Sequence, residues 1–495
     1  CRSLCTHVGE RLLPQQPEMK SLGLIAVLLA APASVWAHAF GEPVQLPMPY
    51  GLYIAGSVLA LVLSFVLLAF SGRPGGQFAN RLNAHSTLAL PAWPARWIRR
   101  ARAAGSLFWL SALLFCIITG LVGSNDSHRN FNMTFFWILF VLGGAYASML
   151  IGDWYKHQHP WRFLLPAHWN GIRKYPRWLG HWPALLQLVC LVAIELFFHS
   201  TPRKLALLLI AFGVFNLAGM WLWGTRRWLQ RGELFAVLFR IFAACTPLRR
   251  TCSIDGKYRW RIALPFSDLR RLRLWHPAQC LFVLFLLSST AYDGLRETAV
   301  YFNVFWQDPF GILTIAFGDH PLKIYPQVRP WFIAWEMALL IASPFFYLLL
   351  FVLFLALGRM LTGGNQSIAL LLRRYLPSLV PIAVVYHLTH YYTLLFSQGL
   401  KIRGLASDPF GWGWNIFGNA ITGRLPWLPD MANIWTSQVV LILAGHVAAV
   451  WLAHQQALQL ERSNRLATLS QLPMLLLMVV FTSVGLWILA QPLQG

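Results

Sequence analysis

The 495-residue sequence has few charged residues. Asp, Glu, Lys and Arg make up 12% of it, which is about half of their share in an ordinary soluble domain. Acidic residues are the scarcest, at 17 against 40 Lys and Arg, so the formal net charge is +23. The seven Cys residues have no paired spacing, which argues against a disulfide framework or a CxxC metal module. These shortages make a soluble α/β enzyme and a disordered chain poor interpretations.

Long apolar runs dominate the sequence instead, and 57% of the residues are hydrophobic. About ten runs are long enough to cross the hydrocarbon core of a bilayer. We therefore predict an all-α, polytopic membrane protein whose single transmembrane domain covers 38–495. The expected spans lie near 51–71, 105–123, 132–152, 182–199, 204–224, 278–293, 331–357, 376–397, 436–455 and 471–491.

The N-terminal region predicts a signal peptide. Residues 1–18 are polar without periodicity, and we expect them to be an upstream or non-native segment. In 19–37, Lys20 precedes a short apolar run, and small residues occupy the last and third-last positions; this is typical of a cleaved secretory signal. Cleavage after Ala37 would expose His38, whose α-amine and imidazole together could chelate copper.

The basic residues predict an orientation. If the mature N-terminus lies outside, most Lys and Arg fall in the inner loops, as the positive-inside rule requires. The highest concentration lies in the loop 225–277, which we expect to be cytoplasmic. Most acidic residues fall on the opposite side, so we expect the chemically active face there.

The loop 225–277 could bind nucleic acid or lie on anionic lipid. We favour lipid and expect no nucleic-acid partner, because apolar residues recur at helical spacing within this basic loop. In this interpretation Arg231 and Arg240 lie near the headgroups. The side chains expected to dip into the membrane are Phe235, Leu238, Phe239 and Phe242.

Two expected outer loops share the string Asp-Pro-Phe-Gly, at Asp308–Gly311 and Asp408–Gly411, and after five intervening residues each string is followed by Phe-Gly. Asp-Pro followed by Gly is turn chemistry, and aromatic residues suit the membrane interface. We therefore expect a structural turn at both places. Ligation by Asp308 or Asp408 is the alternative.

Ionisable side chains inside the expected spans need a partner or a function. His387 and His390 are three residues apart and so share a helix face. His446 and Glu336 lie in other spans at overlapping depth. Three imidazoles and a carboxylate suit zinc or another divalent metal, with Glu336 as the fourth ligand or base. Haem ligation by His387 or His390 opposite His446, and purely structural roles, are the alternatives.

Several segments of the sequence carry a resemblance to a known family: His38–Gly41, Asn130–Asn132 with Thr134–Trp137, Ile151–Tyr155 with Pro160–Arg162, Tyr386–Tyr391 and Ser407–Trp414. In these segments the chain resembles the integral-membrane fenitrothion hydrolases, a family of bacterial membrane proteins. The resemblance implies a bacterial inner-membrane protein that cleaves the aryl ester bond of organophosphorus triesters. It transfers no catalytic residues.

Together these observations predict metal-assisted hydrolysis at the periplasmic face. Zinc or copper would activate water, Asp126 or His128 could assist the leaving group, and an apolar substrate would arrive from the bilayer. A haem- or copper-containing redox protein and a membrane transporter are the alternatives. A homo-oligomer or a sister subunit is compatible with each of them.

Overall fold

In this computed structural model, the described residues are 49–491, except 71–94, 253–257 and positions 167, 199, 273, 275, 426 and 428. They belong to the compact unit Val44–Gly495. The predictions for residues 1–18, for the signal peptide 19–37 and for His38 fall outside the described residues. The account below concerns this one unit.

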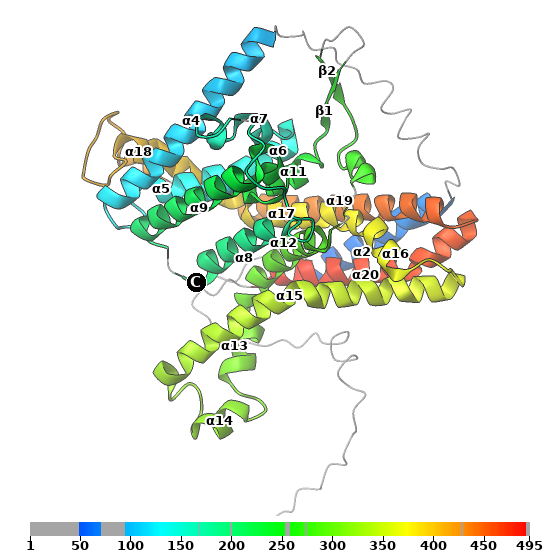
Figure 1. The fold of residues 1–495 in the computed structure, drawn as a ribbon. Coiled ribbons are helices and arrows are strands. Elements are labelled where there is room, and N and C mark those ends of the chain that lie inside the picture. Colours follow the sequence, from blue (N-terminus) through cyan, green and yellow to red (C-terminus); the bar gives the residue numbers. More distant parts are fainter. Residues whose placement is uncertain are drawn as a thin grey trace, which may run out of the picture. The chain divides into compact units, whose positions relative to one another are not determined.

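Helices account for nearly all the regular structure (Figure 1). Nine of the described helical segments are long and apolar enough to cross a membrane, and an apolar helix of 16 residues, α8, lies at the expected tenth span. The prediction of an all-α polytopic membrane protein is therefore confirmed. The helices that match the expected spans are α2 (Tyr50–Phe70), α4 (Ala95–Val122), α5 to α6 (Phe131–Ile151), α8 (Trp182–Phe197), α9 (Pro202–Trp223), α12 (Pro277–Arg296), α15 (Tyr325–Thr362), α16 to α18 (Ile368–Ser407), α19 (Met431–Leu460) and α20 (Asn464–Leu489).

Shorter elements connect these spans. The third span runs through α5 (Phe131–Met133), a π-helical segment (Thr134–Gly143) and α6 (Gly144–Ile151), and the eighth through α16 (Ile368–Tyr375), α17 (Val380–Ser397) and α18 (Ile402–Ser407). The connecting elements are α7 (Tyr155–Gln158), α10 (Thr225–Arg231), α11 (Leu234–Ala243), β1 (Leu248–Cys252), β2 (Tyr258–Ile262), α13 (Ala299–Trp306) and α14 (Ile312–Phe317).

Helix α12 is the most buried of the candidate spans. It packs against α8, α15 and α17. Its start is well defined: Pro277 occupies the first helical position, and the His276 Nδ1 accepts the Ala278 N–H, which satisfies one of the free donors of a helix start. A charged residue on this helix is therefore held inside protein rather than against lipid.

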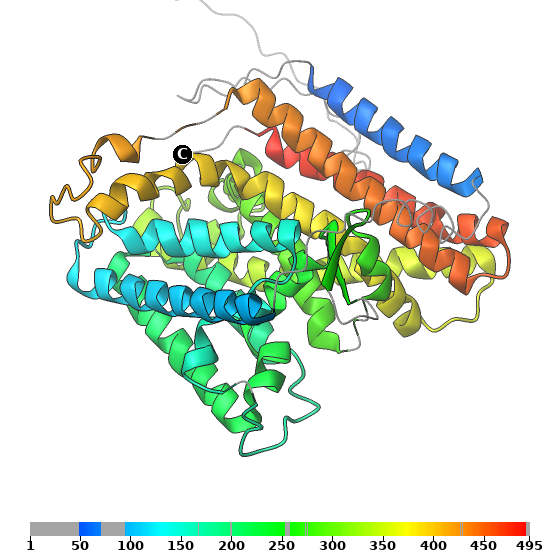
Figure 2. The ribbon, with the colours of Figure 1, turned by 90° about the horizontal axis from the view of Figure 1, so that it is seen from above.

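Helices α2, α19 and α20 lie side by side at one edge of the unit, and α4 packs against α9 on another side (Figure 2). Helices α15 and α20 also pack closely. At their crossing, a Cβ on Gly358 would come within 2.2 Å of the Ser470 carbonyl oxygen. Glycine is required there because any side chain would push the two backbones apart.

Helix α11 contradicts the expectation of a helix lying on the membrane surface. Phe235, Phe239 and Phe242 are almost completely buried within the protein, where α11 packs against α6 and α8; Leu238 is buried as well. The helical spacing of these residues does give α11 one apolar face that is buried. A protein core and a bilayer surface both bury such a face, so the pattern alone could not distinguish them.

The segment 225–277 also contains the one exception to the all-helical architecture among the described residues. Strands β1 and β2 form an antiparallel hairpin in which Leu248 pairs with Ile262 and Cys252 pairs with Tyr258. This basic segment therefore combines a buried helix with a hairpin.

The two Asp-Pro-Phe-Gly strings form the expected turns. Asp308 accepts the backbone N–H groups of Leu313 and Thr314, and Asp408 accepts those of Trp412 and Gly413. The glycine that ends each string has a positive φ, 66° and 71° respectively, where other residues are strained. Both carboxylates thus stabilise their own loops.

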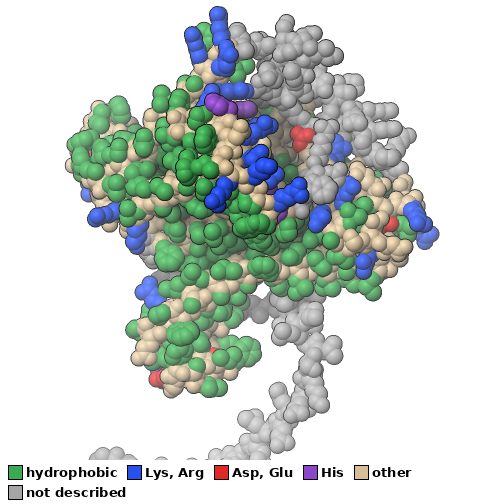
Figure 3. Space-filling view, viewed as in Figure 1, with side chains coloured by type: hydrophobic (Ala, Val, Ile, Leu, Met, Phe, Trp, Pro, Cys, Tyr) green, Lys and Arg blue, Asp and Glu red, His purple; other side chains and the backbone are tan. Residues whose placement is uncertain are grey.

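The space-filling view shows an apolar surface interrupted by groups of Lys and Arg (Figure 3). Exposed apolar side chains include Leu67, Phe70, Val214 and Leu349, all on candidate spans. Apolar patches of this extent are typical of a surface in contact with lipid.

Glu233 links the start of α11 to α7 through hydrogen bonds, and the loss of these bonds should lower the stability of the protein. Its buried carboxylate accepts the Ala236 N–H at the start of α11 and the Tyr155 hydroxyl. Replacing it, as in Glu233→Ala, leaves both donors buried and unpaired, which costs about 1–3 kcal/mol. We expect a lower melting temperature for the detergent-purified variant.

The Glu233→Gln variant is the control, because it keeps an oxygen acceptor but does not titrate. Burial raises the pKa of Glu233 to about 7 from 4.5. Its contribution to the stability of the wild type is therefore complete below about pH 4.5 and is lost as the pH rises through about 7. Glu233→Gln should lack this loss, and identical pH profiles for the two proteins would contradict the assignment.

Candidate intramembrane acid–base site

Asp293, near the end of α12, is the centre of a hydrogen-bonded group inside the bundle. Its Oδ2 lies 3.0 Å from the His390 Nε2 and accepts the Tyr391 hydroxyl at 2.7 Å. Both partners come from α17, which packs against α12. The carboxylate can only accept hydrogen bonds, so the His390 Nε2 carries the proton of this contact.

This arrangement leaves the second nitrogen of His390 available. Nδ1 has no hydrogen bond to the described residues. It lies on the edge of the imidazole ring that is nearest to Gly294. A Cβ on Gly294 would come 3.7 Å from Nδ1 and 2.6 Å from the Ile488 Cγ2. The glycine therefore keeps a side chain away from the nitrogen that can accept a proton.

A second charged group adjoins the first through Arg296, one turn after Asp293 on α12. The Arg296 guanidinium contacts Glu297 at 3.0 Å, and its Nε lies 4.0 Å from the Glu336 Oε1. The Tyr292 hydroxyl donates to the Glu336 backbone carbonyl at 2.9 Å. The carboxylate that the sequence predicted as a ligand or base is thus buried beside an arginine of α12.

His387 lies one turn before Tyr391 on α17 and has different partners from His390. The Tyr146 hydroxyl donates to the His387 backbone carbonyl at 3.1 Å and lies 3.3 Å from its Nδ1. The His387 ring also packs edge-on against Phe242 of α11. Tyr146 lies three residues after the end of the π-helical segment, and segments of this kind are frequent at functional sites.

His446 of α19 lies in another place. Its Nδ1 donates to the Ile442 carbonyl at 2.9 Å, so its Nε2 is an acceptor, which is buried and without a partner among the described residues. The Tyr386 hydroxyl is in the same situation. Both residues line a cavity of about 40 Å³, together with residues of α12, α15 and α20.

The three predicted metal-binding histidines therefore have three sets of neighbours. His387 faces Tyr146, His390 faces Asp293, and His446 faces the small cavity. The described part of the chain contains no group of three or more His, Cys, Asp or Glu side chains that could hold one metal ion. Zinc or copper held by these residues therefore stays a prediction, as does haem.

Asp126 and His128, the predicted outer acid or base, lie in the exposed turn between α4 and α5. Asp126 accepts the backbone N–H of His128 at 2.8 Å. This hydrogen bond shapes the turn, and their part in a reaction stays a prediction.

Sequence reasoning did not assign Asp293, Tyr391 or Tyr146 to the site. One signal was available for Asp293, because a carboxylate that ends an apolar run is costly in a membrane unless it is paired. Its partner could not be identified, since helix contacts between α12 and α17 cannot be read from hydropathy.

Comparisons of the chain with protein-family models, with curated proteins and with solved structures found no match. The resemblance to fenitrothion hydrolases therefore stays a prediction from the sequence.

The separate surroundings of the histidines predict the outcome of a metal analysis. A shared ion requires that His387→Ala, His390→Ala and His446→Ala all lose the same metal. From the geometry we expect His446→Ala to hold as much metal per chain as the wild type and as His320→Ala, a control in the turn before α15. Elemental analysis with an optical spectrum of the detergent-purified proteins also distinguishes zinc, copper and haem. Equal loss from all three variants would contradict our view of the site.

Proposed function

We propose that this protein is a membrane-embedded hydrolase in which the Asp293–His390 pair activates water against apolar organophosphorus triesters. The hydrogen bond between Asp293 and the His390 Nε2 carries this proposal. An imidazole oriented by a carboxylate is a common general base in hydrolytic enzymes. The substrate class rests on the resemblance of the sequence to fenitrothion hydrolases.

Access to the pair supports an apolar substrate. The side chains of His390 and Asp293 keep 17% and 15% of their area exposed, so protein does not enclose the pair completely. We infer that an apolar substrate from the bilayer reaches the pair through this opening between the helices. If the N-terminus lies outside, the end of α12 that carries Asp293 faces the periplasm of a bacterial inner membrane.

The reaction follows from the free nitrogen of His390. Its Nδ1 takes a proton from water while the water oxygen forms a bond to phosphorus. The bond between phosphorus and the aryl oxygen breaks, and the electron pair leaves with the phenolate. Asp293 stabilises the imidazolium through Nε2–H, and the Tyr391 hydroxyl holds the carboxylate in place. The products are a phenolate and a dialkyl thiophosphate, and the imidazolium releases its proton to solvent.

Substitution of the pair tests the proposal. We expect Asp293→Asn and His390→Gln to lower the rate of fenitrothion hydrolysis by about 10²–10⁴-fold, the range contributed by a general base. Tyr391→Phe should lower it less, because the pair itself survives. Release of the nitrophenol by purified protein in nanodiscs measures the rate.

Asp319→Asn and His320→Gln are matched controls in the connection between α14 and α15, where Asp319 contacts the exposed Lys323 and accepts the His320 backbone N–H. They should keep the wild-type rate. Hydrolysis that continues unchanged in a folded Asp293→Asn or His390→Gln protein would rule out this base.

A further inference from the structure

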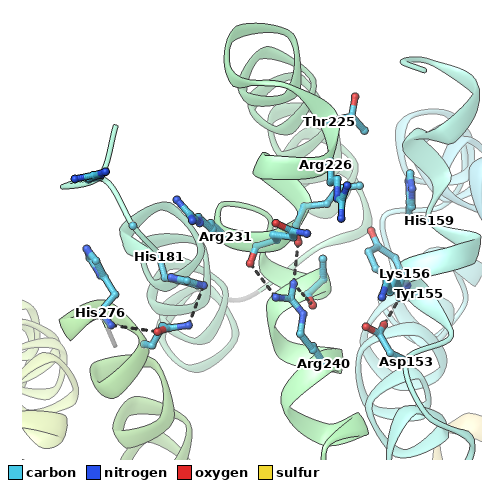
Figure 4. A pocket seen from close by; sticks show the side chains of 16 residues that line it. Asp153, Tyr155, Lys156, His159, His181, Thr225, Arg226, Arg231, Arg240 and His276 are labelled. Atoms are coloured by element: carbon cyan, nitrogen blue, oxygen red, sulfur yellow. Dashed lines mark hydrogen bonds between the residues drawn. The ribbon is translucent and has the colours of Figure 1, made fainter. Parts of the chain in front are cut away.

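A large cavity lies at the other end of α12 from Asp293. It has a volume of about 860 Å³ and lies between α7, α8, α10, α11 and the start of α12 (Figure 4). Gln279 of α12 lines it, and Asp293 follows 14 residues later, so the two places are roughly 20 Å apart. The cavity is therefore distinct from the acid–base site.

The lining of this cavity is strongly basic. It includes one carboxylate, Asp153, and five permanent cations, Lys156, Arg177, Arg226, Arg231 and Arg240. Arg240 has the carboxylates of Asp153 and Glu233 nearby, and its guanidinium donates to backbone carbonyls of Gln230, Leu229 and Ala236. Arg177, Arg226 and Arg231 form no ion pair of 4.0 Å or less with a described carboxylate, and grouped cations of this kind create a positive potential that favours an anion.

Three histidines complete the lining, with His181 and His276 on one side, His159 on the other, and Arg226, Arg231 and Arg240 between them (Figure 4). His276 and His181 also precede the first residues of α12 and α8. The positive ends of two helix dipoles thus add to the charge of the arginines.

The hydrogen bonds around His181 leave a donor without an acceptor. The Gln279 side-chain oxygen accepts the His276 backbone N–H, so the amide nitrogen of Gln279 must donate to the His181 Nε2, 3.2 Å away. The proton of the neutral His181 ring is then on Nδ1, which is buried and has no hydrogen-bond partner among the described residues. The Gln230 carbonyl lies near this ring but not at hydrogen-bond geometry.

His159 has the same feature on the opposite side of the cavity. Its Nδ1 is buried and unpartnered, and only 6% of the residue is exposed. Burial and the charge of Arg162 lower the pKa of His159 to about 4, while burial and Arg240 lower the pKa of His181 to about 4. Both rings are neutral at pH 7. Buried polar atoms without partners are rare in folded proteins, so two of them around one basic cavity point to a ligand.

We propose that this cavity binds a phosphorylated anion, with Arg177, Arg226 and Arg231 on the phosphate oxygens and the His181 Nδ1–H as an additional donor. Guanidinium groups match the bidentate geometry of phosphate. Five cations against one carboxylate suit a multiply charged group better than a single carboxylate ligand. The phosphate can belong to a phospholipid headgroup or to a soluble molecule.

Binding measurements on the full chain test the proposal. In nanodiscs of phosphatidylcholine, we expect calorimetry to detect binding of inorganic pyrophosphate. The variant Arg177→Gln/Arg226→Gln, in which both changed side chains are exposed at the rim, should bind it at least tenfold more weakly. Arg173→Gln is the matched control, four residues from Arg177, exposed and outside the lining.

A second arm distinguishes the sources of the phosphate. If a lipid headgroup occupies the cavity, nanodiscs of phosphatidylglycerol should suppress pyrophosphate binding, and native mass spectrometry should detect retained lipid that the double variant loses. If the ligand is soluble, pyrophosphate should bind equally in both kinds of nanodisc. The proposal is overturned if the wild type binds neither probe, or if the double variant, folded as judged by its melting temperature, binds both as the wild type does.

Discussion

The pairing of Asp293 with His390 is the interaction on which this account depends. A lone carboxylate among apolar helices costs several kcal/mol, and here the hydrogen bonds from His390 and Tyr391 compensate for that cost. Because the donors come from α17 and the acceptor from α12, the same contacts hold the two helices in register. The same hydrogen bonds thus orient the His390 imidazole and stabilise the packing of α12 against α17.

The bundle separates two chemical environments along α12. At its end, the Asp293 carboxylate and the His390 imidazole are hydrogen-bonded between α12 and α17. At its start, arginines and histidines surround a cavity of about 860 Å³. An apolar neutral molecule suits the first environment and a phosphorylated anion suits the second, so the two proposals concern different ligands and can fail independently.

Hydropathy was sufficient for most of the fold, because a bilayer requires long apolar helices with internally satisfied backbones. The expected spans match the observed helices, including α8, although α15 extends well beyond the expected 331–357. Depth along a helix could also be read from the sequence, and it placed His387, His390, His446 and Glu336 at overlapping depths, which stays a prediction. The direction in which a side chain points around its helix could not be read: His446 lines a separate small cavity, whereas His390 contacts Asp293. For the same reason, α11 was expected on lipid and lies in the core.

The most direct test follows the oxygen atom of the attacking water. Purified protein in nanodiscs would hydrolyse fenitrothion in ¹⁸O-labelled water, and mass spectrometry would locate the label in the products. Attack at phosphorus by a water molecule that His390 activates predicts label in the dialkyl thiophosphate, none in the nitrophenol, and a much slower appearance of label with His390→Gln. Label in the nitrophenol, or no hydrolysis by the wild type, would contradict the account.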